Sequence, residues 1–426
     1  MNVLLFIVII LFVALAIRIP IAFAMILCSL VFFWLTNTSV LIIPQRFFSG
    51  LNSFTLLALP LFICTGYLME TAGISRRLID FSSAIVGHIR GGLGLVNVLT
   101  SMFFAGMSGS AVADTAAIGS ILIPGMIERG YPPNFSAAIT ASSSSIGIIV
   151  PPSIPMILFS VASGTSVAAL FAAGYIPGLL VGLSQMFVVY CFAKKYNYPI
   201  ENNFSWRRLL ITLKDSALPL LIPIIIIGGL VFGVVTPTEA GLLAFIVALL
   251  TAIIYRAMNL KLLYKVLLQG ALSSSVVCII IMASNVFAWI LTHERIPHEI
   301  ASRLIAISDN KTVLLLILAT VLIPIGSLFH AVPMIFIFVP IIMPAITALN
   351  IPPVQFGMVF ILAVAIGQQT PPVASALYIT SLLAKVDVIS ITRVNIWFIL
   401  CLAFVMYLVI FVPNISLYIP RILGWV

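Results

Sequence analysis

The chain has 426 residues, of which 62% are hydrophobic and only 7% are charged. A soluble protein carries charges on roughly a quarter of its residues, so this composition excludes a soluble enzyme and indicates a polytopic membrane protein. The net charge of +9 does not indicate nucleic-acid binding, because the basic residues fall at the ends of apolar segments rather than on one soluble face.

Apolar segments of membrane-spanning length follow one another along the first half of the chain. Spans are expected at about 3–17, 20–36 and 53–72, and a polar helix follows them at about 73–90. The apolar segment 93–128 is interrupted by GMSGSAVAD, and the segment 134–163 is interrupted by IIVPPSIP. A further span is expected at 174–193. The polar stretch Lys194–Arg208 then marks the boundary between two halves.

The second half repeats this plan in the same order. Spans are expected near 216–235, 238–257 and 271–292, and a polar helix follows them near 294–310. The segment 311–348 is interrupted at Gly326–Pro333, and 354–384 is interrupted at Gly367–Ser375. A last span is expected at 393–415.

The interrupted regions of the two halves are related by a duplication. Residues 106–160 align with residues 326–380 at a constant offset of 220, and most of the identical positions are Gly or Pro. Because these two residue types break helices, the duplicated feature is a pattern of interruptions. In membrane proteins, paired segments broken by Gly and Pro point to a transport site between two structural repeats.

The distribution of basic residues suggests a topology. If 93–128 and 311–348 are re-entrant hairpins, each half crosses the membrane five times and the second half is inverted. Fifteen of the twenty basic residues then lie on one side, which the positive-inside rule makes cytoplasmic, with both termini on the other side. If each hairpin segment crossed the membrane completely, each half would still cross an odd number of times. The distribution of charge alone therefore does not decide between re-entrant hairpins and full crossings. Each side of the first break has only about 15 apolar residues. Such a segment is short for a membrane span, which favours hairpins.

The predicted fold is therefore an all-α polytopic membrane protein with inverted structural repeats, each containing a re-entrant hairpin and a discontinuous transmembrane helix. The polar helices could act as arms that join a fixed frame to a moving core. The expected units are first-half scaffold spans and arm (1–92), first-half transport core (93–163), a sixth-position span with the inter-repeat link (164–215), second-half scaffold spans and arm (216–310), second-half transport core (311–384), and the last span with the C-terminus (385–426).

Broken helices offer ligands for both ions and anions. Free carbonyl groups at one half-helix end suit Na⁺, and free N–H groups at the other suit a carboxylate. The hydroxyl groups that could complete a cation shell belong to Ser108, Ser110, Ser327 and Thr370. The hypothesis is two quasi-symmetric ion sites with an anion between them. The alternative is that these Gly and Ser residues only let helices pack closely.

Four other polar residues near the breaks are candidates for substrate contact. Asp114 is the only acidic residue within an apolar segment, and it could face substrate, ligate a cation, anchor the tip or cap a helix. Ser153 could present its hydroxyl group to substrate or cap a helix. Gln368 could orient a polar substrate or satisfy freed backbone groups. His330 could contact substrate, titrate as a coupling group or be structural.

Two other function classes are suggested by parts of the sequence. The sequence Gly106-Met107-Ser108-Gly109 fits a GxSG nucleophile, and with His330 as base it would suit an intramembrane serine protease. The duplication argues against this alternative, because a protease needs no second pocket. A channel is disfavoured because the polar breaks lie in separated pairs. No ATP-binding GxxxxGK[ST] loop occurs, so the chain is not expected to hydrolyse ATP, and no HExxH motif or Cys/His cluster suggests a metalloenzyme. A transporter rather than an enzyme is therefore expected.

Five motifs give the chain a family resemblance. They are SFTLLALPLFI (Ser53–Ile63), GMSGSAVADTAAIGSILIPGM (Gly106–Met126), GYPPNFSAAITASSS (Gly130–Ser144), IVPPSIPMI (Ile149–Ile157) and GQQTPPVAS (Gly367–Ser375). With these motifs the chain resembles the large membrane subunit of tripartite ATP-independent periplasmic (TRAP) transporters, the DctM-like family. The resemblance spans essentially the whole chain.

The resemblance implies an elevator-type, Na⁺-coupled importer of organic acids, such as a C4-dicarboxylate, sialic acid or another sugar acid, in the bacterial inner membrane. It also implies a separate small four-helix membrane subunit and a periplasmic substrate-binding protein as partners. The residues that look like the first Na⁺ site are Ser108, Ser110, Ser145, Gly147, Val150 and Pro152. Those that look like the second are Gly326, Ser327, Gly367 and Thr370. Asp114 and Ser153 are similar to residues near the substrate, and His330 and Gln368 transfer less directly.

Overall fold

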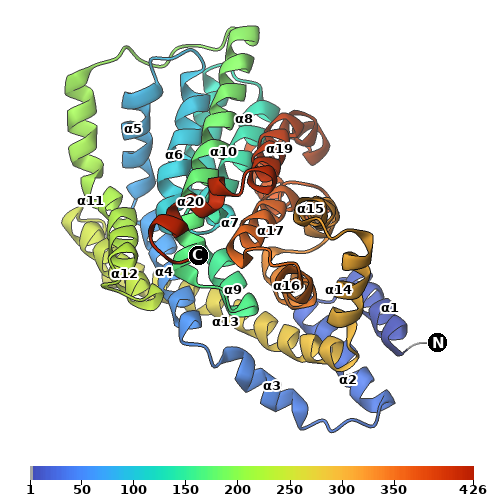
Figure 1. Ribbon diagram of the computed structural model, residues 1–426. Helices are drawn as coiled ribbons and strands as arrows, with labels where there is room; N and C mark the ends of the chain where they lie inside the picture. Colours follow the sequence, from blue (N-terminus) through green and yellow to red (C-terminus); the bar gives the residue numbers. More distant parts are fainter. Residues whose placement is uncertain (1–2) are drawn as a thin grey trace.

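The computed structural model describes residues 3–426, and within them the chain is helical, with no strand (Figure 1). The first half contains α1 (Val3–Ala16), α2 (Ile21–Leu35), α3 (Ile42–Leu51), the 3-10 helix η1 (Phe54–Leu57), α4 (Ala58–Thr71), α5 (Ile74–Val86), α6 (Gly92–Ser108), α7 (Ala111–Glu128), α8 (Pro133–Ser144), the 3-10 helix η2 (Ser145–Ile148), α9 (Ile154–Ser163) and α10 (Val167–Tyr196). The second half contains α11 (Trp206–Val231), α12 (Pro237–Ile254), α13 (Leu260–His293), α14 (Ile296–Ile307), α15 (Lys311–Leu328), α16 (Ala331–Ala348), α17 (Pro353–Gly367), α18 (Ser375–Ala384), α19 (Val388–Phe411) and α20 (Asn414–Ile422).

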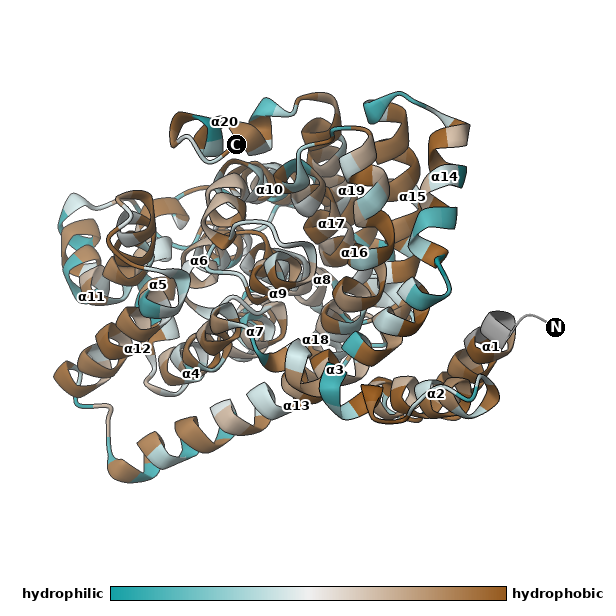
Figure 2. Ribbon diagram, turned by 60° about the horizontal axis from the view of Figure 1, so that its bottom comes forward, coloured by the Kyte–Doolittle hydropathy of each residue, from teal (hydrophilic) through white to brown (hydrophobic). Residues whose placement is uncertain are grey.

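Among residues 3–426, nine helices are long and apolar enough to cross a membrane. Hydrophobic residues cover most of the helical surface, and hydrophilic ones gather in connecting segments and on α14 (Figure 2). Many large apolar side chains, such as Trp34 and Phe232, lie on the outside of the molecule. These are the properties of a multi-pass membrane protein.

All four predicted interruptions are present, and each is shorter than its motif. Only Gly109 and Ser110 separate α6 from α7, and only Phe329 and His330 separate α15 from α16. The breaks after η2 and α17 extend over 149–153 and 368–374, and each contains a cis Pro-Pro bond. Helical geometry tolerates Gly106 and Gly326 because one internal glycine costs only about 1 kcal/mol.

The structure corrects several predicted boundaries. The helices α3 and α20 were not predicted, because short segments with a proline and an amphipathic pattern resemble loops. The helix α13 begins at Leu260 rather than near 271, since polar residues in its first turns obscure its start. The helix α10 runs from 167 to 196 rather than 174 to 193, so the irregular link covers only 197–205.

The segments around the breaks form the centre of the molecule. The helix α18 packs against α7 and α8, and α9 packs against α16, so each broken helix contacts the hairpin of the other half. Almost every residue of α17 is buried. Flanking helices lie on two sides, with α4, α5, α11 and α12 together on one side and α1, α2 and α14 on the other (Figure 1). The long α13 contacts both groups.

A buried polar network ties the first hairpin to the first broken helix. Asn97 Nδ2 on α6 donates to the hydroxyl oxygen of Thr140 on α8 at 2.7 Å, and the Ser143 hydroxyl on α8 donates back to Asn97 Oδ1 at 3.0 Å. Ser101 also donates to Ser143 at 2.9 Å. Hydrogen bonds between side chains inside a membrane hold helices together, so α6 and α8 form one packed unit.

Candidate functional site

The first hairpin tip is a two-residue turn between α6 and α7. Gly109 has a φ of 63°, a left-handed conformation that favours glycine. The hydroxyl oxygen of Ser110 accepts the Ala113 N–H at 3.4 Å and is the N-cap of α7. The Ser108 hydroxyl is buried and donates to Asp114 Oδ1, and its oxygen accepts the Ser110 N–H at 3.3 Å. The tip therefore holds Ser108 and Asp114 together.

Asp114 is the only charged residue that is buried among residues 3–426. Its exposed fraction is 0%, and its Oδ2 atom has no hydrogen-bond partner in that part of the chain. Ser110 rather than Asp114 is the N-cap of α7, and Asp114 lies in the first turn of that helix. A buried carboxylate oxygen without a partner carries a large desolvation cost. A nearby cation would lower this cost, so a buried oxygen without a partner is a candidate cation ligand.

The broken helix of the first half lies directly against this tip. The Ile154 N–H, at the start of α9, donates to the Gly109 carbonyl oxygen at 3.3 Å. A Cβ atom added at Gly147 would overlap the Asp114 carboxylate, and one added at Gly109 would lie 2.7 Å from the Pro152 carbonyl oxygen. These approaches place the backbone of the break beside Ser108 and Asp114.

The remaining predicted residues of the first break are buried or half-buried. The Ser145 hydroxyl donates to the Ser142 carbonyl oxygen at 2.6 Å, and its oxygen retains a lone pair for a cation. The Ser153 hydroxyl donates to the Ile148 carbonyl oxygen at 2.6 Å and caps α9 by accepting the Met156 N–H. Ser153 is therefore a helix cap, and its contact with substrate stays a prediction. Val150 is half-buried against Gly178 of α10.

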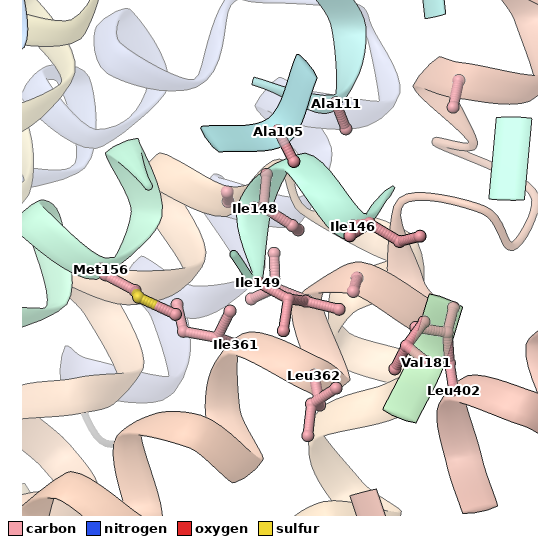
Figure 3. Close-up of a cluster of buried hydrophobic side chains, with 14 of the residues drawn as sticks. Ala105, Ala111, Ile146, Ile148, Ile149, Met156, Val181, Ile361, Leu362 and Leu402 are labelled. Atoms are coloured by element: carbon pink, nitrogen blue, oxygen red, sulfur yellow. The ribbon is translucent and has the colours of Figure 1, made fainter. Parts of the chain in front are cut away.

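An apolar layer closes the other side of this break. Ile146, Ile148 and Ile149 point into a cluster that includes Ala105 and Ala111 of the hairpin and Ile361 and Leu362 of α17 (Figure 3). These side chains are buried. The first break thus has a polar face toward the tip and an apolar face toward the second half.

The second hairpin tip meets its broken helix in a similar way. The Val373 N–H donates to the Ser327 carbonyl oxygen at 3.0 Å, as Ile154 does to Gly109 in the first half. Gly326 and Gly367 lie backbone against backbone, and a Cβ atom added at Gly367 would overlap the backbone of Gly326. The Ser327 hydroxyl donates to the Pro324 carbonyl oxygen at 2.7 Å.

The polar side chains of the second break differ in their surroundings. The Thr370 hydroxyl donates to the Ile366 carbonyl oxygen at 2.9 Å and is half-buried. Gln368 is 8% exposed, whereas Gln369 is fully buried and its Oε1 atom accepts Asn395 Nδ2 at 3.2 Å. Asn395 is not among the predicted site residues, although an amide side chain within the otherwise apolar α19 could have indicated it. His330 is exposed, in contrast to Ser110 at the matching position.

The structure thus gathers the predicted residues into two groups. Ser108, Asp114 and Gly147 adjoin in the first, and Gly326, Ser327 and Gly367 adjoin in the second. The helices α7, α9, α16 and α18 all begin at the breaks, and α6, η2, α15 and α17 all end there. Partial positive charges from helix N-termini and free carbonyl oxygens from C-termini therefore converge on the same region.

Comparisons with known proteins agree with this architecture. The family model of the tripartite ATP-independent periplasmic transporter, DctM component, matches residues 8–415. The sialic acid TRAP transporter large permease protein SiaM of Vibrio cholerae is 38% identical over 405 residues, which is 95% of each chain. The C4-dicarboxylate TRAP transporter large permease protein DctM of Pseudomonas aeruginosa is 38% identical over 387 residues, which is 91% of each chain.

Two solved structures have a similar fold at low sequence identity. The YdaH transporter of Alcanivorax borkumensis has a TM-score of 0.61 at 13% identity, covering 86% of each chain. MtrF of Neisseria gonorrhoeae has a TM-score of 0.57 at 15% identity, covering 86% of this chain and 83% of that one. These likenesses concern the fold alone.

Proposed function

Because the chain belongs to the DctM family, the large permease component of tripartite ATP-independent periplasmic (TRAP) transporters, we propose that it moves an organic acid across the inner membrane together with Na⁺. The observation that carries the sodium part is the buried carboxylate of Asp114, whose Oδ2 atom has no partner among the described residues. A cation beside it would neutralise a charge that is otherwise costly to bury. Asp114 is thus a better candidate for an ion ligand than for a substrate contact.

The first proposed Na⁺ site lies between the first hairpin tip and the first break. Its side-chain ligands would be the Asp114 carboxylate and the Ser108 and Ser145 hydroxyl groups, with Ser110 at the rim. Backbone carbonyl groups of Gly147, Val150 and Pro152 would complete an all-oxygen shell, which is the shell that hard cations prefer. The close approach of Gly147 to the carboxylate supports this grouping.

The second proposed Na⁺ site lies at the matching contact of the second half. Carbonyl oxygens of Gly326 and Gly367 and the hydroxyl groups of Ser327 and Thr370 are its candidate ligands. This group contains no carboxylate, so a cation there would bring a net positive charge. That charge favours an anionic substrate in the adjacent space, and binding of the two would be mutually supportive.

The substrate class is proposed from the family and from the helix ends. Relatives are named for sialic acid, C4-dicarboxylate and 2,3-diketo-L-gulonate transport, and all three are acids. Four helix N-termini at the breaks can bind a carboxylate. We further propose inverted repeats with an elevator movement of α6–α9 and α15–α18, and periplasmic termini. The proposed partners are a small membrane subunit and a periplasmic binding protein that delivers the acid.

The protease alternative has no support. The Ser108 hydroxyl donates to the Asp114 carboxylate, and His330 is exposed at the other hairpin tip. A nucleophilic serine needs an adjacent base that accepts its proton and is itself oriented by a third group.

The proposed coupling predicts Na⁺-dependent uptake. Proteoliposomes that contain the chain and its two partners should accumulate radiolabelled acid when a Na⁺ gradient is applied and not when choline replaces Na⁺. The double variant Ser108→Ala and Ser110→Ala should raise the Na⁺ concentration for half-maximal uptake about tenfold. It removes two candidate oxygen ligands, each of which contributes about 0.5–1.5 kcal/mol to the free energy of Na⁺ binding.

The matched control removes two hydroxyl groups of similar type outside the breaks, Ser274→Ala and Ser275→Ala on α13, and should leave the Na⁺ dependence unchanged. Uptake that proceeds equally in choline would contradict sodium coupling. An unchanged Na⁺ dependence in the Ser108 and Ser110 variant would remove these hydroxyl groups from the site.

A further inference from the structure

A pair of buried amides joins the second break to α19. Gln369 in the break and Asn395 on α19 are both fully buried. Asn395 Nδ2 donates to Gln369 Oε1 at 3.2 Å and to the Gln369 backbone carbonyl oxygen at 3.4 Å. Gln369 Nε2 donates in turn to the Ala365 carbonyl oxygen at 3.4 Å. Side-chain amides therefore tie the end of α17 and the break to α19.

Asn395 occupies a position on α19 that packing alone would fill with an apolar side chain. Ile391, Phe398 and Leu402 lie on the same face of the helix, at successive spacings of three or four residues, and all three are buried. A buried polar group costs free energy unless it is hydrogen-bonded, and Asn395 Oδ1 has no partner among residues 3–426. An amide here is a poor choice for stability alone, which indicates a role at the break that it contacts.

The contact of Asn395 reaches a proposed Na⁺ ligand through a single peptide group. The Gln369 carbonyl group, which accepts from Asn395, and the Thr370 N–H belong to the same rigid plane. The Thr370 N–H donates to the Gly367 carbonyl oxygen at 2.9 Å. Fixing one end of this plane therefore fixes the donor at its other end, and with it the direction of the Gly367 carbonyl group. A carbonyl oxygen that accepts one hydrogen bond keeps a second lone pair for a cation.

The first half cannot form the same pair. At the offset of 220, Gln369 corresponds to the apolar Ile149, and Asn395 corresponds to Tyr175 on α10. The first proposed Na⁺ site contains a carboxylate, whereas the candidate ligands of the second are all neutral oxygens. Neutral ligands attract a cation only when their dipoles are directed at it, so their positions matter more in the second site.

We propose that Asn395 is a positioning residue for the second Na⁺ site, and that its amide holds Gln369 so that the Gly367 carbonyl group points to the ion. Asn395 itself contacts neither the ion nor the substrate. The helix α19 packs against both α17 and α8, so it holds the second break in place beside the first broken helix. This proposal rests on the sodium coupling proposed above and adds a residue that controls the affinity of one of the two sites.

The test begins with Asn395→Leu, which keeps the size of the side chain and removes its donor. The Na⁺ concentration for half-maximal uptake into proteoliposomes should rise about tenfold, because a buried carbonyl group loses the hydrogen bond that directs it. The maximal rate at saturating Na⁺ should stay within about twofold of the wild-type rate, since the site keeps its own ligands. At equal concentration, Na⁺ should also raise the unfolding temperature of the purified variant less than that of the wild-type chain.

A second variant separates positioning from stability. Asn395→Leu leaves Gln369 Oε1 buried without its donor, whereas Asn395→Leu with Gln369→Met removes both amides and should recover much of the lost unfolding temperature. It should not recover the Na⁺ affinity, because the backbone carbonyl group of residue 369 is still not held. The exchange Asn395→Gln with Gln369→Asn keeps two amides of the same total length and should restore part of the Na⁺ affinity.

The matched control is Gln355→Met. Gln355 is a buried amide at the opposite end of α17, and its Nε2 atom donates to the Val409 carbonyl oxygen of the same α19 at 3.1 Å. This variant should keep the wild-type Na⁺ dependence.

Three results would overturn the positioning role: a wild-type Na⁺ dependence in Asn395→Leu, an equal shift in Gln355→Met, or recovery of the Na⁺ affinity when both amides are removed. Wild-type uptake that proceeds equally in choline would be a different failure, because it would overturn the sodium coupling itself and this proposal with it.

Discussion

The variant Asp114→Asn is expected to lower the initial rate of Na⁺-driven uptake by about 100-fold or more. The amide keeps the size of the side chain and can still accept a hydrogen bond from Ser108, but it removes the only buried charge among residues 3–426. Removing one partner of a buried ion pair costs about 3–5 kcal/mol, and about 3 kcal/mol corresponds to a loss of 100-fold or more.

Thermal unfolding gives this variant a second and independent readout. Na⁺ should raise the unfolding temperature of the wild-type protein and should have no effect on Asp114→Asn. In Na⁺-free buffer the variant should be at least as stable as the wild-type protein, because it no longer buries an unpaired carboxylate. The control is Glu128→Gln, an acid-to-amide change at the exposed far end of α7, which should behave like the wild-type protein. Full Na⁺-induced stabilisation of Asp114→Asn would rule out Asp114 as an ion ligand.

The variant Gly367→Ala should have the second largest effect. Its Cβ atom would overlap the backbone of Gly326, so the second hairpin tip and the second broken helix would have to move apart. Forcing a methyl group into a packed contact costs about 1–3 kcal/mol, and here the displaced atoms are backbone atoms that cannot change rotamer. We expect a lower unfolding temperature and an uptake rate at least about tenfold lower, because the carbonyl groups proposed for the second Na⁺ site would separate.

A matched glycine tests whether this effect is local. Gly125 on α7 is also helical, and a Cβ atom added there would have no neighbour within 4 Å. The variant Gly125→Ala should therefore be as stable as the wild-type protein or slightly more stable, since alanine favours a helix over glycine by about 1 kcal/mol. If Gly367→Ala behaved like Gly125→Ala, the close contact between Gly326 and Gly367 would have no role in transport.

The positions of the helix breaks could be predicted from the sequence because Gly and Pro act on the local backbone. A proline removes a hydrogen-bond donor wherever it lies, and the pairs at Pro151-Pro152 and Pro371-Pro372 mark two of the four breaks directly. The predicted bounds of the two interrupted segments, 93–128 and 311–348, agree with the outer ends of α6–α7 and α15–α16 to within one residue. That these segments are re-entrant stays a prediction, since α7, α15 and α16 are long enough to cross a membrane. The family resemblance is likewise confirmed by the match over residues 8–415.

Tertiary contacts could not be predicted in the same way. The sequence shows that Asp114 lies in an apolar segment, but only the folded chain shows that Ser108 satisfies one carboxylate oxygen and leaves the other without a partner among the described residues. The packing of α9 on α16 and of α18 on α7 joins segments that are far apart in the chain. The pair of Gln369 and Asn395 also joins the second break to α19, and the sequence alone offers only two separate amides in apolar segments.

The most direct test of the account is a pair of cryo-EM maps of the protein, one in Na⁺ and one in choline. In Na⁺ the account predicts a density peak between Ser108, Asp114 and the backbone at Gly147, and a second peak at the contact of Gly326 and Gly367 beside Thr370. Both peaks should be missing in choline. Maps in which both positions lack density in Na⁺, with the Asp114 carboxylate satisfied by protein groups alone, would contradict the claim that the broken helices bind the coupling ions.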